Sequence, residues 1–198
     1  NKSFSFETLM VMDYQIIKAV SYITSQWNGG STTELFIYPM TSKYATRNFN
    51  FRLSTATVNI EESTFTSLPG ITRTLMVLDG EMTLAHKGHH TAKLGRFDSD
   101  NFKGDWNTFS KGKCSDFNLM TMGNTQGIVE SLHVNKEKQV DFSFSDNIQH
   151  LVIYVYSGQI KIENETIETG DLVVFENPTK SIEFISVEKC DLIISKVF

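Results

Sequence analysis

Residues 51–84, FRLSTATVNIEESTFTSLPGITRTLMVLDGEMTL, decide the fold of this chain. Along residues 51–58 the side chains alternate between two faces, so Arg52 and Ser54 share one face and Phe51 and Leu53 lie on the other. The run at 75–78 predicts a buried strand. The Asp-Gly that follows is typical of a type I′ turn, which returns a strand on itself as a β-hairpin. This stretch therefore predicts a sheet wall followed by a hairpin.

The same pattern recurs later in the chain. LMVLDGEMTL at residues 75–84 can be laid over IYVYSGQIKI at residues 153–162, and Gly80 then coincides with Gly158. Four strand-forming residues, a glycine and an alternating return strand occur in both copies, which indicates duplication of one β-unit. A closed β-structure is expected, because a sheet that joins itself leaves no free edges.

Composition narrows the class of protein. The chain has 198 residues, 40% hydrophobic and 21% charged, and its 15 Phe favour strands over helices. A net charge of -5 without a Lys/Arg cluster predicts no nucleic-acid partner. Cys114 and Cys190 lie far apart, which favours reduced thiols in a cytoplasmic protein. No apolar run approaches the roughly 20 residues of a membrane span, so no membrane association is expected.

A set of polar residues is the strongest candidate for a binding site. WNGGSTTE at 27–34 contains a Gly-Gly pair that lets backbone amides approach a ligand, although a plain connecting turn explains it as well. Alternation along 114–122 places a carboxylate and an amide on one strand face. The candidate ligand-binding residues are Trp27, Asn28, Thr33, Glu34, Arg52, Arg73, Asp116 and Asn118.

The functional hypothesis depends mainly on Arg52 and Arg73. A guanidinium presents a fixed fork of donors that matches a carboxylate, so Arg52 and Arg73 together could hold a dicarboxylate. The alternative is a structural one, in which both form salt bridges at a barrel rim. Inward-facing arginines without a ligand would need acidic partners, and Glu34 and Asp116 could supply them.

Five motifs carry a family resemblance. WNGGSTTE, FRLSTATV, FTSLPGITRTLMVLDGEMTL, FKGDW and SDFNLMT follow one another over residues 25–123. In this order they resemble the HutD/Ves family of double cupins. The resemblance implies an all-β, cupin-type double-stranded β-helix (jelly-roll), a bicupin with two related barrel halves at residues 1–123 and 124–198. It also implies a role in histidine degradation (histidine utilization), sensing or regulating through a small carboxylate such as N-formylglutamate. No cofactor is expected.

The sequence departs from the metal-binding pattern of many cupins. Those proteins use His-x-His, a Glu and a later His, and residues 75–84 contain no histidine. His86, His89 and His90 are weak metal candidates, since imidazole suits zinc, copper or nickel. A third or fourth ligand is not evident, so a solvated loop is the preferred interpretation and no metal is expected.

Three functions stay open at this stage. The favoured one is a metal-free protein that binds a small anionic metabolite. A second is a cofactor-free enzyme of isomerase or hydrolase type, with Glu34 or Asp116 as general base. A third is a scaffold that presents a surface to another protein. The sequence favours binding over catalysis and leaves the assembly state open, a homodimer included.

Overall fold

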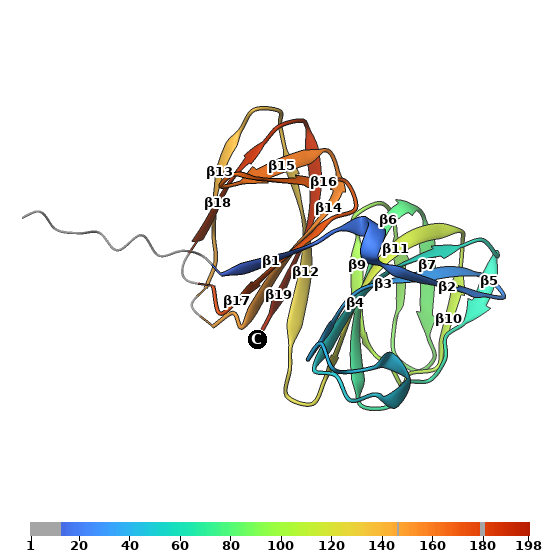
Figure 1. Cartoon of the computed structure of the whole chain (residues 1–198). Helices are drawn as coiled ribbons and strands as arrows, with labels where there is room; N and C mark the ends of the chain where they lie inside the picture. Colours follow the sequence, from blue (N-terminus) through green and yellow to red (C-terminus); the bar gives the residue numbers. More distant parts are fainter. Residues whose placement is uncertain (1–12, 146, 179–180) are drawn as a thin grey trace, which may run out of the picture.

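The computed structural model describes residues 13–145, 147–178 and 181–198, and these form an all-β protein (Figure 1). The described chain starts with β1 (Tyr14–Ile17) and the 3-10 helix η1 (Ala19–Ser21). The elements of the first half then follow: β2 (Ile23–Trp27), β3 (Gly30–Tyr38), the 3-10 helix η2 (Tyr44–Thr46), β4 (Phe51–Val58), β5 (Glu62–Thr64), β6 (Ile71–Gly80), β7 (Met82–His86), β8 (Thr91–Leu94), β9 (Ser99–Lys103), β10 (Thr108–Lys111) and β11 (Cys114–Met122). The second-half elements are β12 (Gly127–Val134), β13 (Gln139–Ser143), β14 (His150–Ser157), β15 (Gln159–Ile162), β16 (Glu165–Glu168), β17 (Leu172–Glu176), β18 (Ser181–Ser186) and β19 (Cys190–Val197). The all-β prediction is confirmed.

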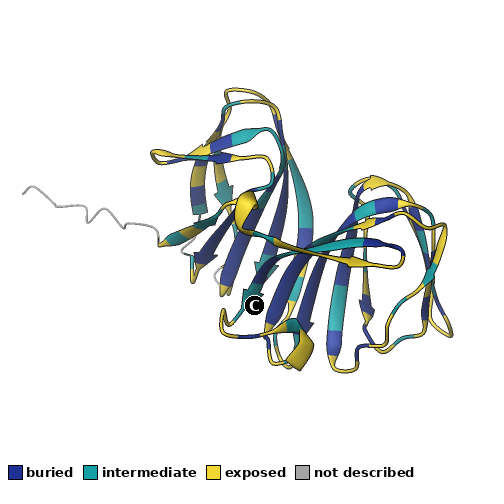
Figure 2. Cartoon of the chain, turned by 45° about the vertical axis from the view of Figure 1, so that its right-hand side comes forward, coloured by how far each residue is buried: buried dark blue, intermediate teal, exposed yellow. Residues whose placement is uncertain are grey.

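The strands form four sheets arranged as two pairs. In the first unit, the sheet β2-β3-β4-β11-β6-β9 packs on the sheet β5-β10-β7-β8. In the second unit, β1-β17-β14-β19-β12 packs on β13-β18-β15-β16. The six-stranded and five-stranded sheets also pack on each other, and their facing strands are buried (Figure 2). The molecule therefore has an apolar core inside each unit and a third between them.

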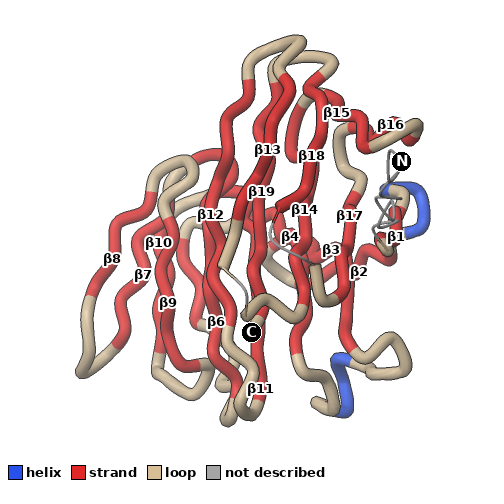
Figure 3. Tube along the Cα trace, turned by 90° about the vertical axis from the view of Figure 1, so that its left-hand side faces the viewer, coloured by secondary structure: helices blue, strands red, loops and turns tan. Residues whose placement is uncertain are grey.

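The second unit repeats the strand order of the first. The order β4-β11-β6-β9 with β5-β10-β7-β8 recurs as β12-β19-β14-β17 with β13-β18-β15-β16. Between β11 and β12 the chain passes from the first pair of sheets to the second. However, β1 crosses over: Tyr14 pairs with Phe175 and Ile17 with Leu172, so the start of the described chain joins the second unit (Figure 3).

The glycines of the repeat do not close hairpins, so that prediction is wrong. β6 pairs with β11 and β9, whereas β7 pairs with β10 and β8, and Gly80 is where the chain passes from one sheet to the other. Gly158 does the same between β14 and β15. Their φ angles are +79° and +84°. A Cβ would lie 2.5 Å from the Lys113 carbonyl oxygen at Gly80, and 2.4 Å from that of Lys189 at Gly158. Both positions therefore require glycine.

Two smaller expectations concern the cysteines and the membrane. Cys114 and Cys190 are buried free thiols, and each begins the strand that packs against the glycine of its own unit. No helix in the described ranges is long and apolar enough to cross a membrane.

Candidate functional site

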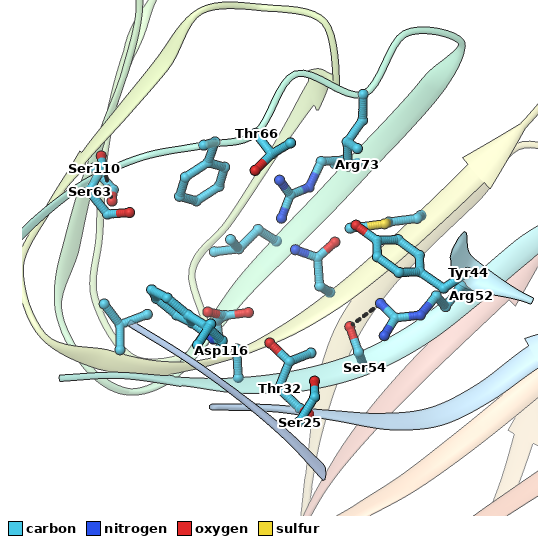
Figure 4. Close-up of a pocket in the computed structure, with 18 of the residues that line it drawn as sticks. Ser25, Thr32, Tyr44, Arg52, Ser54, Ser63, Thr66, Arg73, Ser110 and Asp116 are labelled. Atoms are coloured by element: carbon cyan, nitrogen blue, oxygen red, sulfur yellow. Dashed lines mark hydrogen bonds between the residues drawn. The ribbon is translucent and has the colours of Figure 1, made fainter. Parts of the chain in front are cut away.

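A cavity of about 390 Å³ opens inside the first unit, between its two sheets (Figure 4). Its charged side chains come from β4, β6 and β11, and other polar residues come from β2, β3, β5, β10 and the loops beside them. Its lining residues are Ser25, Trp27, Thr32, Tyr44, Arg52, Ser54, Ala56, Val58, Ser63, Thr64, Phe65, Thr66, Leu68, Arg73, Leu75, Ser110, Asp116, Asn118 and Met120.

Strand register explains why both arginines reach this cavity. Met120 on β11 lies opposite Arg52 on β4 and opposite Arg73 on β6, so the three side chains form one row across neighbouring strands. Neighbouring strands are about 4.8 Å apart, which separates the Cα atoms of the two arginines by about 10 Å. Two residues before Met120 on β11, Asn118 lies opposite Ser54 on β4 and opposite Leu75 on β6. The cavity wall is thus an ordered grid of side chains.

Arg52 is held firmly in place. Its Nε donates a hydrogen bond to Glu34 Oε2 at 2.6 Å, and its Nη1 donates to Ser54 Oγ at 3.1 Å. The guanidinium also lies over the Tyr44 ring, 4.3 Å from the ring centroid. Because Glu34 neutralises it, Arg52 adds a positioned donor to the cavity and little unbalanced charge.

Arg73 differs from Arg52 in having a hydrogen-bond donor that no described residue pairs with. Its Nε is buried and has no hydrogen-bond partner among the described residues. The guanidinium rests on aromatic faces, 4.7 Å from the Phe65 centroid and 5.2 Å from that of Phe102. Burial lowers the pKa of Arg73 to about 10, and the charge of Asp116 opposes this shift. Arg73 therefore stays cationic at neutral pH and can still bind an anion.

Asp116 and Asn118 complete the polar wall. Burial raises the pKa of Asp116 to about 7, although Arg73 acts to lower it. This carboxyl group therefore changes charge near neutral pH, and in its neutral form it can donate a hydrogen bond. Asn118 Oδ1 is buried without a hydrogen-bond partner in the described part of the chain. Since buried polar atoms are normally paired, Arg73 Nε and Asn118 Oδ1 are atoms of this wall that can accommodate a further hydrogen-bond partner.

Of the other candidate residues, the structure places Trp27 at the cavity but neither Asn28 nor Thr33. Trp27 lines the cavity and is 40% exposed. Asn28 is exposed and does not line it. The Thr33 hydroxyl lies 2.8 Å from that of Thr24, outside the cavity, because alternation along β3 turns Thr32 inward instead. Glu34 acts on the site through Arg52. The expectation that Asn28 and Thr33 line the same cavity as the arginines is not met.

Sequence reasoning missed several lining residues. Ser54 and Thr32 carry a usable signal, since each lies two positions from a candidate on its own strand and therefore on the same face. Tyr44 carries none, because it comes from the short η2 segment, whose docking over Arg52 depends on the tertiary fold.

The histidines lie outside this cavity, and the solvated-loop interpretation is wrong for His86. Its side chain is fully buried, and its Nε2 lies 2.8 Å from Asp100 Oδ2. His90 also contacts Asp100, whereas His89 stacks on Trp106 with centroids 3.7 Å apart. Thus β9 contributes an acidic residue that the sequence pattern did not connect with the histidines.

The repeated all-β architecture is cupin-like, and solved structures share it. YhhW from Escherichia coli superposes with a TM-score of 0.72 at 10% identity, over 93% of this chain and 97% of that one. Oxalate decarboxylase from Bacillus subtilis gives a TM-score of 0.67 at 7% identity, covering 92% and 76%. At these identities the similarity is one of fold.

The family is more specific than the fold. A model of the HutD family matches residues 19–194, so the chain belongs to the HutD family, as its motifs predict. HutD from Pseudomonas fluorescens has a TM-score of 0.69 at 21% identity, covering 94% of this chain and all (100%) of that one. A conserved protein of unknown function from Pseudomonas aeruginosa gives 0.76 at 22% identity, covering 93% and 98%. No curated protein matches this chain significantly.

Proposed function

We propose that this HutD-family protein binds a small metabolite carboxylate in the cavity of its first unit, and that it senses or regulates histidine degradation through that ligand. N-formylglutamate is the first candidate. In this proposal the two repeated units are the two barrels of a bicupin, and only the first carries a ligand. The observation that supports the proposal most is the Arg73 guanidinium, whose Nε is buried and unpartnered at the cavity wall.

The charge arrangement suits a dicarboxylate. Arg73 has unused donors for one carboxylate, and bonds of this charge-assisted kind contribute about 1.5–3 kcal/mol each. Arg52, fixed by Glu34, presents its remaining donors from the other end of the row. A molecule with two acidic ends about as far apart as the two guanidiniums is the best match.

The polar groups between the arginines suit an amide. Asn118 offers an unsatisfied side-chain amide from the middle of the wall. Asp116 can donate a hydrogen bond when it is neutral, and it is next to Asn118 on the same strand face. An amide-bearing dicarboxylate can therefore satisfy the centre of the cavity as well as its charged ends. The cavity volume of about 390 Å³ falls within the usual range for small-molecule sites.

Calorimetric titration tests this function. We expect N-formylglutamate to bind at one site per chain, and its diamide, which lacks both charges, to bind at least about ten-fold more weakly. Arg73→Leu should weaken binding by about ten- to a hundred-fold, the effect of one lost charge-assisted bond. Thr33→Ala, on β3 but facing away from the cavity, is the matched control and should bind as the wild type does. Equal affinity for the diacid and the diamide would contradict the proposal.

A second candidate function rests on Asp116. Its pKa, raised to about 7, is that of a group able to take up and release a proton at neutral pH, as a general base must. Glu34 is a weaker candidate because it is paired with Arg52. If the protein is a cofactor-free enzyme of isomerase or hydrolase type, NMR should detect turnover of N-formylglutamate. Asp116→Asn should then abolish turnover while binding persists.

A further inference from the structure

A second cluster of polar side chains lies away from the arginine cavity, where the two sheets of the first unit meet. His86 ends β7 of the four-stranded sheet and His90 lies in the turn just before β8, whereas Asp100 belongs to β9 of the six-stranded sheet. We propose that His86, His90 and Asp100 bind a divalent transition-metal ion, with zinc as the first candidate. This site is independent of the proposed carboxylate cavity.

A tight turn brings the two histidines together. The His89 N–H donates to the His86 carbonyl at 3.0 Å, and the His86 N–H donates to the His90 carbonyl at 2.9 Å. Gly88 permits this turn through a φ of +82°. The His86 and His90 rings are consequently 4.7 Å apart, centroid to centroid. Both rings present the same nitrogen, Nε2, to one carboxylate.

The distances are close to those of a coordination shell. Asp100 Oδ2 lies 2.8 Å from His86 Nε2, and Oδ1 lies 2.9 Å from His90 Nε2. One ligand atom from each residue can be chosen so that all three lie within 4.8 Å of one another. Zinc binds nitrogen and oxygen at about 2.0–2.2 Å, which places tetrahedral ligand atoms about 3.4 Å apart. Shifts of several tenths of an ångström in these side chains therefore suffice to admit the ion.

The other nitrogen of His86 is held by a hydroxyl. His86 Nδ1 lies 2.7 Å from the Thr108 hydroxyl, which is also 3.3 Å from the Trp106 carbonyl oxygen. This contact fixes the orientation of the ring, with Nε2 directed at the Asp100 carboxylate. When the hydroxyl accepts from Nδ1–H and donates to Trp106, Nε2 has a lone pair free for a metal ion, and metal-bound histidines are commonly oriented by such a hydrogen bond.

The surroundings suit a bound ion that can enter from outside. The His86 side chain is fully buried and its ring lies 4.5 Å from that of Phe102, whereas the His90 side chain is 43% exposed. Water can complete the coordination from the His90 side. The Phe102 ring contacts His86 and also supports Arg73, so it forms an apolar partition between this cluster and the arginine cavity.

Zinc titration of the full chain, purified without a polyhistidine tag and stripped with chelator, tests the site. We expect one zinc ion per chain by calorimetry and a rise in melting temperature, because the ion joins β9 to the β7–β8 turn. Cobalt(II) in place of zinc should give the visible absorption of a nitrogen- and oxygen-bound ion. The readouts require neither an activity nor a carboxylate ligand.

Four variants test whether zinc binds at His86, His90 and Asp100. His90→Ala and Asp100→Asn should each weaken zinc binding by at least about a hundred-fold and remove the rise in melting temperature. Thr108→Val, which deletes the hydroxyl that orients His86, should weaken it by about ten- to a hundred-fold. His89→Ala is the control, because its exposed ring stacks on Trp106 outside the cluster. Absence of stoichiometric binding by the wild type, or equal binding by His90→Ala and His89→Ala, would overturn the proposal.

Discussion

The two units of this protein share a strand order and differ in what they bury. Aligning Gly80 with Gly158 places Arg73 of the first unit at the position of Leu151 in the second. Leu151 is fully buried within the apolar core of its unit. One position of the same architecture thus holds a guanidinium at a cavity wall in one unit and hydrocarbon in the other.

The same contrast holds on the neighbouring strand. In each unit the register shifts at the same place, between Ser115 and Asp116 on β11 and between Asp191 and Leu192 on β19. Asp116 therefore corresponds to Leu192. Two residues further along β11, Asn118 corresponds in the same way to Ile194, which is fully buried. The second unit therefore has hydrocarbon at the positions of Arg73, Asp116 and Asn118, although Glu130 and Lys196 form an ion pair at the positions of Ser54 and Met120.

This difference shows that the fold does not need the polar residues. The second unit forms the same sheets around an apolar core. Replacing buried ion pairs by well-packed hydrophobic residues is often neutral or stabilising, so Arg73 and Asp116 are difficult to explain as stabilising groups. A ligand that satisfies them gives a physical reason for their presence.

Placing the charge of the first unit in the second should be the most damaging change. Leu192→Asp puts a carboxylate into a closed apolar core without a cation, and we expect a loss of about 3–5 kcal/mol in the free energy of unfolding. Urea denaturation measures this loss. Leu192→Met, which keeps the site apolar, is the control. A loss below about 1 kcal/mol for Leu192→Asp would mean that the second unit also tolerates a polar interior.

The reverse exchange should favour stability and abolish binding. The double variant Arg73→Leu/Asp116→Leu gives the first unit the residues of the second, and we expect unfolding to become harder by up to about 1–4 kcal/mol. Calorimetry should detect no binding of N-formylglutamate. A double variant that is strongly destabilised would instead assign the two residues a structural role.

Gly80 and Gly158 occupy the same position in the two units, so substituting them tests a feature that the units share. Gly80→Ala and Gly158→Ala should each cost more than the roughly 1–2 kcal/mol of a left-handed backbone, because the added Cβ also meets a carbonyl oxygen. Gly70→Ala is the matched control, with a φ of +77° and open space around the Cβ position. We expect thermal melts to show similar losses for the two repeat glycines and a smaller loss for the control.

The pH dependence should be the smallest effect. Burial raises the pKa of Asp116 to about 7, so its stabilising contribution is complete below its unfolded pKa of 3.8 and is lost as the pH rises through about 7. An anion also prefers the neutral carboxyl, so N-formylglutamate should bind up to about ten-fold more tightly at pH 6 than at pH 8. Asp116→Asn should flatten both profiles. A wild-type affinity that is constant over this range would contradict the assignment.

The sequence allowed the architecture to be predicted well where local rules apply. Strand alternation placed Arg52 with Ser54 and Asp116 with Asn118, and the aligned glycines indicated the duplication. The hairpin prediction failed because an Asp-Gly turn can also carry the chain between sheets, and only the neighbouring strands decide which occurs.

The site was less predictable for a similar reason. The Arg52–Glu34 pair was foreseen as one alternative, because both residue types belonged to one constellation. Asp100 was not connected with His86, since the contact joins two different sheets and depends on their packing. Tyr44 was missed because a short loop segment carries no periodicity.

A structure of the protein crystallised with N-formylglutamate tests the central claim most directly. We predict ligand density in the first unit, with a carboxylate within hydrogen-bond distance of the Arg73 guanidinium, and none inside the second unit. Ligand density elsewhere on the molecule, or a first-unit cavity that holds only water at saturating ligand, would contradict the account.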